Sequence, residues 1–599
     1  ETRRNILEPE KIKNAGAMHE NSPRIRALAR YSGFCRGMPI LLALLAVPAL
    51  AQEVSENDYF GDLPVVLSVS RLAQPLNEVP GAVTVIDRET IRRSGAREVA
   101  DVLRLVPGFL VTHRNGANAV ATYHSALDVY GARMQVYVDG RSVYSPYYLG
   151  DTHRGLMGVV LEDIERIEVL RGSNSAAFGG NAFLGVVNIV TQHAADTHGV
   201  MVSASVGDKG VDDNVVRFGW GDENASFRLT SSRRSDNGLN NVFDDTHLGQ
   251  LHFRGDMRFG PRDDVTLTLG ATSQSFGEGV LASSCTVGGF AFRCDSNKER
   301  SNLARNGYAH LQWTRMLSAD ESIRWSFSHE QEYLRDNFLA ERFAVVPFGP
   351  PFTALNYHYA VVDAGGKGLR QSIEGQHTLR LTPSVRAVWG AEARREEVVS
   401  QPVFSTSSSF SQQQLRLFGN VEWRPLTDMV LNGGGMWERS SISGGWFAPR
   451  FAANYHLSAD HTVRTSVSQS FRDPGLYELR TNTKLTIYPV AFFGTSVVSA
   501  ATGQVKPEQL ITQEVGYLGH FRPLGLSVDF RGYVERMNKR ISSSSQDFVN
   551  FPGPQNRGFE YQLDWRPGDS TRLTLSEAHM RVLDGRAGQG ESMEAPHRT

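Results

Sequence analysis

From about residue 198 onward, apolar and polar residues alternate in segments of about ten residues. Clear cases are 250–259, 265–273 and 415–423, in which nearly every second residue is apolar. Because successive side chains of a β-strand point to opposite faces, this period of two predicts strands with one apolar and one polar face. The chain holds roughly 16–17 such segments, so we expect one large antiparallel sheet.

The connections between these segments are alternately short and long. Tight turns are predicted at 424–427 and 566–569, and long polar connections at 274–304, 335–368 and 471–508. This asymmetry is typical of an outer-membrane β-barrel, and Trp423, Tyr455 and Trp565 near strand ends suit its aromatic girdles. A soluble β-sandwich or propeller is disfavoured, because the chain shows no fixed repeat period.

Residues 75–195 follow a different pattern, which predicts a compact α+β domain. Short strands are expected at 83–86, 136–138, 164–170 and 185–191. Two helices are expected at 88–94 and 96–106, with a break at Gly95 and an end at Pro107 and Gly108.

The N-terminal 51 residues resemble an export signal. The apolar run 38–51 has only 14 residues, which is too short for a membrane-spanning helix. Arginines precede this run, and Ala49 and Ala51 form a small-x-small cleavage site before Gln52. A buried core helix is the weaker interpretation. We therefore expect 1–51 to comprise upstream residues and a cleaved signal peptide.

Composition narrows the class of protein. The chain has 599 residues, a net charge of -2 and 3 cysteines, with a mean hydropathy of -0.30. These values disfavour a polytopic helical membrane protein, a disulfide-dense scaffold and a basic nucleic-acid binder. The common nucleotide-binding, hydrolase and zinc motifs are missing, so we expect no enzyme and no nucleic-acid partner.

Two cysteines remain after the signal, Cys285 and Cys294. An even pair at close spacing in an exported chain favours a disulfide that closes a small loop. A metal site is weaker because no histidine flanks either residue, and two free thiols are the remaining alternative.

Residues 162–192 carry the motif E-R-I-E-V-L-R-G and then G-V-V-N-I-V. The stretch resembles the plug-domain signature of TonB-dependent outer-membrane receptors, although Ser173, Phe178 and Gln192 depart from the usual residues. Five further segments resemble ordered motifs of the same family: 79–108, 136–144, 470–480, 506–517 and 556–565.

The resemblance implies a mainly β fold, in which an N-terminal α+β plug domain sits inside a large antiparallel transmembrane β-barrel. It divides the chain into 52–74 (linker), 75–195 (plug domain) and 196–599 (barrel). Family barrels have 22 strands and end on an aromatic residue, whereas this chain ends EAPHRT. We therefore expect a barrel that is incomplete at the C-terminus.

The resemblance also implies a TonB box, a short extended segment that pairs as a strand with the TonB protein. We expect it in 62–68, with the contacts made by Leu63, Pro64, Val65, Val66, Leu67 and Ser68. Strand addition supplies main-chain hydrogen bonds. The alternative is a short strand that leads into the plug.

Further partners follow from the same resemblance. TonB draws on the inner-membrane ExbB/ExbD complex, and the barrel needs outer-membrane lipids and the barrel-assembly machinery. The ligand is a metal chelate, and the receptor acts as a monomer.

Family plugs are held by arginines that pair with barrel glutamates. Arg171 matches one plug arginine, and Glu514 and Glu560 match the barrel carboxylates. The second usual arginine is Tyr130 here, and Arg133 is a candidate substitute. A solvated surface carboxylate is the alternative for Glu560.

Upper plug loops and external loops bind substrate in this family. The candidates are aromatic and basic residues of 113–128 and 144–158, namely Tyr123, His124, Tyr144, Tyr147, Tyr148, His153 and Arg154. Such a set suits a rigid anionic chelate, and ordinary loop packing is the alternative. We rank an iron siderophore first, cobalamin second and haem, glycans or peptides third, since no histidine lies between Phe471 and Glu508.

No cofactor is expected, but the loop 235–247 could bind structural Ca²⁺ through Asp236, Asp244 and Asp245. A solvated polar loop is the more ordinary interpretation. A passive porin is the main alternative function and an adhesin a further one. Neither would need the segment 62–68.

Overall fold

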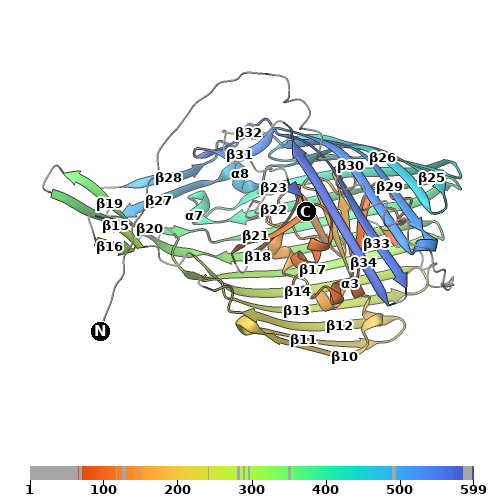
Figure 1. Ribbon diagram of the computed structural model, residues 1–599, viewed down its shortest axis with the longest axis horizontal. Helices are drawn as coiled ribbons and strands as arrows, with labels where there is room; N and C mark the ends of the chain where they lie inside the picture. The colour runs from red at the N-terminus through yellow and green to blue at the C-terminus, as the bar shows by residue number, and fades with distance from the viewer. Residues whose placement is uncertain are drawn as a thin grey trace, which may run out of the picture. The chain divides into compact units, whose positions relative to one another are not determined.

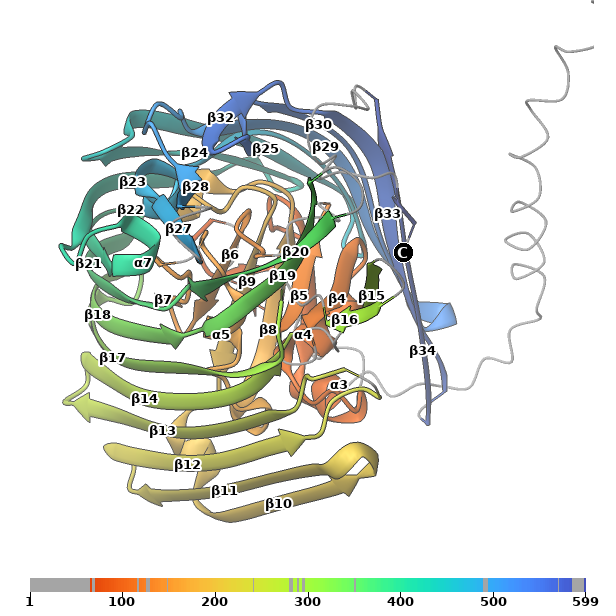
Figure 2. The same ribbon diagram turned by 90° about the vertical axis from the view of Figure 1, so that its left-hand side faces the viewer.

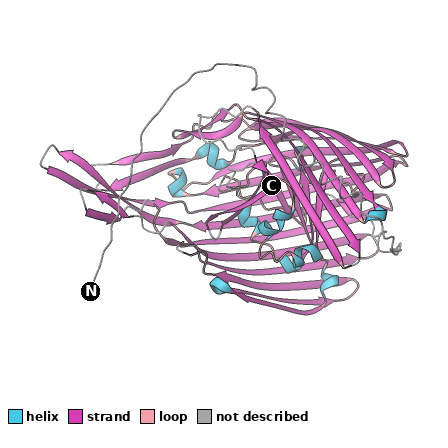
Figure 3. Ribbon diagram, viewed as in Figure 1, coloured by secondary structure: helices cyan, strands magenta, loops and turns pink. Residues whose placement is uncertain are grey.

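The computed structural model describes most of the chain from residue 65 onward. The described residues are 65–66, 70–583 and 597–598, with gaps at 116–117, 125–129, 148, 241, 280–283, 288–289, 294–296, 349–351, 489–493 and 569. Strands dominate these residues (Figure 3). In this part of the chain no helix is long and apolar enough to span a bilayer.

Seventeen long strands and the short β35 form one antiparallel sheet, drawn in Figure 1 from yellow β10 to blue β34. The strands are β10 (Gly199–Gly207), β11 (Val211–Gly221), β12 (Ala225–Asp236), β13 (Thr246–Phe259), β14 (Asp263–Glu278), β17 (Arg300–Ser318), β18 (Glu321–Arg335), β21 (Gly366–Thr382), β22 (Val385–Val399), β23 (Phe410–Leu426), β24 (Met429–Ser440), β25 (Gly444–Ser458), β26 (His461–Arg472), β29 (Glu508–Phe521), β30 (Leu526–Asn538), β33 (Gln555–Gly568), β34 (Thr571–Val582) and β35 (His597–Arg598). This confirms the predicted large antiparallel sheet.

The two faces of this sheet have opposite character. On β23, Leu417 has 48% of its surface exposed, whereas its neighbour Arg416 has only 1% exposed. A soluble protein would bury the leucine and expose the arginine. The inverted pattern repeats around the sheet and fits an outer face in contact with lipid. Trp423, Tyr455 and Trp565 lie exposed next to short turns, as expected for an aromatic girdle.

Short turns lie at one end of the strands and longer connections at the other. The strands continue further into the long connections than their alternation predicted. Those connections carry extra elements: β15 (Ser284–Val287), β16 (Phe290–Arg293), β19 (Asn337–Phe348), β20 (Phe352–Asp363), α7 (Gln401–Phe404), α8 (Leu476–Arg480), β27 (Asn482–Tyr488), β28 (Thr495–Ala500), β31 (Arg540–Ser544) and β32 (Asp547–Phe551). We call this the long-loop end.

The plug domain is the α+β unit inside the curve of the barrel strands (Figure 2). Its sheet has the order β3-β8-β9-β6-β7, and only β6 and β9 pair in parallel. Its elements are β3 (Ala82–Asp87), α3 (Arg88–Arg93), α4 (Val99–Val102), β4 (Phe109–Asn115), β5 (Asn118–Tyr123), β6 (Met134–Val138), β7 (Arg141–Ser142), α5 (His153–Leu156), β8 (Ile164–Arg171), α6 (Ser175–Phe178) and β9 (Gly185–Thr191).

A core of its own holds the plug together. Val102, Leu103 and Val136 are almost fully buried in it. The helix predicted at 96–106 is shorter than expected: α4 ends at Val102 and a 3-10 turn follows over Leu103–Leu105.

Candidate functional site

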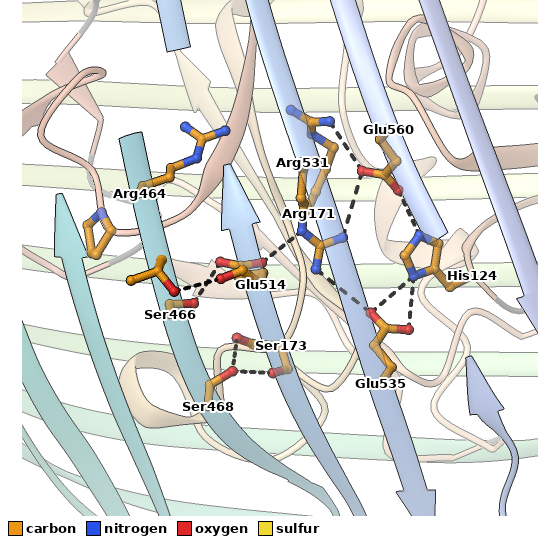
Figure 4. A network of polar contacts seen from close by, with 12 residues as sticks. His124, Arg171, Ser173, Arg464, Ser466, Ser468, Glu514, Arg531, Glu535 and Glu560 are labelled. Atoms are coloured by element: carbon orange, nitrogen blue, oxygen red, sulfur yellow. Dashed lines mark hydrogen bonds and ion pairs between the residues drawn. The ribbon is translucent and has the colours of Figure 1, made fainter. Parts of the chain in front are cut away.

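The plug meets the barrel wall in a buried polar cluster, which we call the lock cluster: Tyr123, His124 and Arg171 of the plug, with Glu514, Asp529, Arg531, Glu535 and Glu560 of the barrel (Figure 4). The plug residues come from the ends of β5 and β8, and the barrel residues from β29, β30 and β33. Interior-facing positions of these adjacent strands therefore converge on one edge of the plug.

His124 lies between two barrel carboxylates. Its Nδ1 is 3.1 Å from both carboxylate oxygens of Glu535, and its Nε2 is 2.7 Å from Oε1 of Glu560. Since each ring nitrogen faces an acceptor, both nitrogens donate and the ring is an imidazolium. Burial lowers the pKa of His124, but Glu535 and Glu560 outweigh burial and raise it above its ordinary value.

Arg171 supplies the second plug cation of the lock cluster. Its Nη1 is 3.2 Å from Oε2 of Glu560, and it also pairs with Asp529. Glu560 is completely buried, so the alternative of a solvated carboxylate is wrong. The structure thus brings Arg171 and Glu560 together, as their family positions suggested.

Barrel groups complete the lock cluster. Glu514 accepts a hydrogen bond from Nε of Arg531 at 2.7 Å, within the barrel wall. Tyr123 donates to Glu560 at 2.6 Å and accepts from Arg531 at 2.8 Å. Each buried charge therefore has a partner of opposite sign, which buried ion pairs require.

Arg133 makes a separate plug–barrel pair. Its Nη2 lies 2.8 Å from Oε1 of Glu508, and Arg472 holds the other oxygen of Glu508 at 2.6 Å. Arg133 therefore contacts the barrel as a plug arginine, but through Glu508 and not through Glu514 or Glu560.

A further contact escaped the sequence analysis and has the reverse polarity. Arg217, Arg228 and Arg254 on three adjacent barrel strands donate to plug oxygens. Arg228 reaches the backbone oxygen of Gln192 at 2.7 Å, and Arg254 reaches the hydroxyl of Thr191 at 2.8 Å. Three arginines at interior positions of neighbouring strands were a readable signal, since an interior cation needs an acceptor.

The N-terminal segment ahead of the plug also docks on it. Val65 and Val66 form β1 (Val65–Val66), which pairs antiparallel with β2 (Gln74–Pro75). Val66 is buried in a small core with Val79 and Val186. Leu63, Pro64, Leu67 and Ser68 lie outside the described residues.

The residues predicted to bind ligand are divided by the structure. Tyr123 and His124 are buried in the lock cluster. Tyr147 is buried under α7 and α8 with Phe404 and Leu476, and its hydroxyl donates to the backbone oxygen of Ala364 at 2.9 Å.

The remaining candidates lie near the long-loop end of the plug. His153 begins α5 and is buried, as is Tyr144. Arg154 is 3.7 Å from Asp151 and lines a small cavity with Glu330 and Glu332. Tyr148 lies outside the described residues.

Two other predicted features stay predictions. Cys285 lies in β15, but Cys294 lies outside the described residues. In the loop 235–247, Asp236 pairs with Arg97 at 2.9 Å and Asp244 accepts from the backbone N–H of Leu239 at 2.8 Å. Among the residues that the structure describes, no group of three or more metal-ligating side chains is present.

Two family models match the chain. The model described as TonB-dependent Receptor Plug Domain matches residues 75–186, and the model described as TonB dependent receptor-like, beta-barrel matches residues 197–595. Together they cover most of the sequence.

Two curated relatives have low identity to the chain. The vitamin B12 transporter BtuB of Vibrio vulnificus is 22% identical over 517 residues, which cover 81% of this chain and 72% of the relative. An iron-regulated outer membrane virulence protein of Vibrio cholerae is 22% identical over 477 residues, which cover 76% of this chain and 66% of the relative.

Two solved structures share the fold. The siderophore receptor PirA from Acinetobacter baumannii has a TM-score of 0.64 at 15% identity and covers 86% of this chain and 82% of its own. The ferripyoverdine receptor of Pseudomonas aeruginosa has a TM-score of 0.65 at 13% identity and covers 92% of this chain and 79% of its own.

Proposed function

This chain belongs to the TonB-dependent receptors, which are outer-membrane proteins and not enzymes, and we propose that it actively takes up an iron–siderophore chelate. Cobalamin is the alternative ligand. The proposal has three parts, which are the gate, the energy source and the substrate.

The plug is the gate, and its contacts with the barrel carry this part of the proposal. The plug occupies the barrel interior, and buried charges hold it at the lock cluster and at Arg133. Removing one partner of such a pair is costly. Passage of a chelate therefore requires work on the plug, which distinguishes this chain from a passive porin.

TonB supplies that work, with ExbB/ExbD as its source of energy. The segment Leu63 to Ser68 is the proposed TonB box. Val65 and Val66 pair with β2, so TonB has to replace β2 as the strand partner of these residues. The interaction with TonB is a property of the family, whereas the position of the box is the proposal.

The relatives and the long loops support a siderophore. The proteins of similar fold include a siderophore receptor and a ferripyoverdine receptor. At the long-loop end, Tyr359 of β20 and Tyr488 of β27 stack with ring centroids 5.1 Å apart, and the exposed Arg480 and Lys484 lie in the same connection as Tyr488. Aromatic rings beside cations suit a flat anionic chelate. Cobalamin stays the alternative because one relative is a vitamin B12 transporter.

The test is uptake in a bacterial strain without siderophore or cobalamin receptors of its own. Radiolabelled ferric siderophores and cobalamin are supplied with and without TonB. We expect TonB-dependent uptake of a ferric siderophore and its loss on deletion of residues 62–68. Uptake that ignores TonB would refute the gated receptor, and TonB-dependent uptake of cobalamin alone would replace the substrate.

A matched pair of variants tests the aromatic residues. Tyr359→Ser with Tyr488→Ser should weaken binding of the chelate at least about tenfold. Tyr455→Ser, on the outer face at the short-turn end, should leave binding unchanged.

A further inference from the structure

The two ends of the barrel differ in how their exposed arginines are paired. At the short-turn end, Arg315, Arg380 and Arg522 have acidic partners: Asp263 at 3.6 Å, Asp320 at 2.9 Å and Asp460 at 2.6 Å. These arginines are neutralised by the turns of the chain itself.

The long-loop end presents arginines on the outer face without such partners. Arg439, Arg536, Arg557 and Arg581 are exposed, and none of the four makes an ion pair within the described part of the chain. Their neighbours Glu438, Glu535 and Asn556 are buried in the barrel interior. Because side chains alternate along a strand, the arginines point outward.

Three of these arginines lie together on β30, β33 and β34. Arg557 is directly opposite Arg581 in the strand register. Arg536 is opposite Gln555, two residues from Arg557, which places it on the diagonal about 7–8 Å away. Like charges placed directly opposite each other are destabilising. We call this group the arginine triad, and it lacks an anion in the described residues.

The arginine triad lies at one level of the membrane. Arg536 is ten positions beyond Leu526, where β30 begins, and Arg581 is ten beyond Thr571, where β34 begins. Arg557 is eleven positions before Gly568, where β33 ends. At about 3.3 Å per residue and a tilt of about 40°, ten residues rise about 25 Å. This height equals the apolar band of such barrels, so the triad reaches the outer-leaflet interface.

Arginine is suited to phosphate, because its guanidinium donates two parallel hydrogen bonds to the oxygens. Phe559 is exposed on the same face of β33, two residues closer to the membrane centre, where it can contact acyl chains. We propose that the arginine triad is a binding site for the phosphate groups of a phosphorylated lipid in the outer leaflet. This inference does not depend on the transported ligand.

The experiment uses the full chain purified in a non-ionic detergent. Native mass spectrometry measures retention of a bis-phosphorylated acylated glucosamine disaccharide, and of the same lipid without its phosphates. We expect at least tenfold tighter binding of the phosphorylated lipid. The triple variant R536Q/R557Q/R581Q should lose this preference, whereas R315Q/R380Q/R522Q should keep it. Equal preference in wild type and the triple variant, or loss in both variants, would overturn the proposal.

Two further measurements keep the test decisive. Inorganic phosphate at the same concentration should not displace the lipid, and displacement would show a simple anion site instead. Arg557→Gln alone should weaken lipid binding about threefold and, without lipid, raise the thermal midpoint because it relieves the repulsion from Arg581. A lower midpoint together with unchanged lipid binding would refute the triad even if the triple variant does not fold.

Discussion

The Nε2 atom of His124 lies 2.7 Å from Oε1 of Glu560, although 436 residues separate the two in the sequence. The contact joins the plug to the barrel wall, and the same imidazole faces Glu535 through Nδ1. His124 is thus a second plug cation beside Arg171. It holds two barrel carboxylates at once, so its removal exposes both to the cost of an unpaired buried charge.

Replacing His124 by alanine should loosen the plug. Glu535 and Glu560 would lose a buried cation, and we expect a loss of about 3–5 kcal/mol in the free energy of plug unfolding. Limited proteolysis of the plug at increasing urea concentration measures this change. The control is His247→Ala, at an exposed position of the barrel, and equal effects of the two substitutions would contradict the assignment.

The stability of the plug should fall as pH rises. The pKa of His124 is raised above its ordinary value of 6.5, so its contribution is complete below about pH 6.5 and is lost as pH rises through the folded-state pKa. Urea midpoints between pH 6 and pH 9 should decrease, and the slope should become smaller in His124→Gln. The pKa of His113 is also raised, chiefly by its hydrogen bond to Glu98. His113→Gln is therefore the matched control, and a slope that depends on His113 alone would exclude a role for His124.

Glu508 should matter more than Arg133. Glu508→Gln leaves both Arg133 and Arg472 with a neutral partner, whereas Arg133→Met leaves Glu508 paired with Arg472 at 2.6 Å. We expect the loss of plug stability to be larger for Glu508→Gln by about 1–3 kcal/mol. A double-mutant cycle on the two positions gives their coupling energy, and a coupling near zero would show that their contact contributes nothing.

Gly108 should tolerate no side chain. Its φ is +81°, and a Cβ would lie 2.6 Å from Oε1 of Glu560 and 2.8 Å from the ring of Tyr123. Gly95 has φ +69° but open space around the same position. Gly95→Ala should therefore cost only the backbone strain of about 1–2 kcal/mol. Gly108→Ala should cost clearly more and increase proteolysis of the plug, and equal costs would show that the lock cluster gives way easily.

The outer face should resist charge at mid-height. Val421 is exposed five positions from Leu426, where β23 ends, so Val421→Lys should destabilise the folded barrel by about 2–4 kcal/mol in lipid vesicles. Gln413→Lys, near the long-loop end of the same strand, should cost about 0–1 kcal/mol. The comparison is made by equilibrium unfolding in vesicles, and a reversed order would contradict the assignment of the outer face.

Much of the fold was readable because its rules are local. Alternation in 415–423 predicted a strand with Leu417 and Arg416 on opposite faces, and the structure has that strand as β23. Short turns and long connections alternated as expected. The signature around residues 162–192 identified Arg171 as a plug residue that pairs with the barrel.

The tertiary structure decided which distant residues meet. The sequence identified His124 as an aromatic and basic loop residue and predicted a ligand contact, but the fold places it against Glu535 and Glu560. Arg557 and Arg581 became neighbours only through the register of β33 and β34. Side-chain alternation depends on successive bonds of one strand, and the sequence alone determines it. Contacts across hundreds of residues depend on strand register, barrel curvature and the position of the plug, which the whole folded chain sets together.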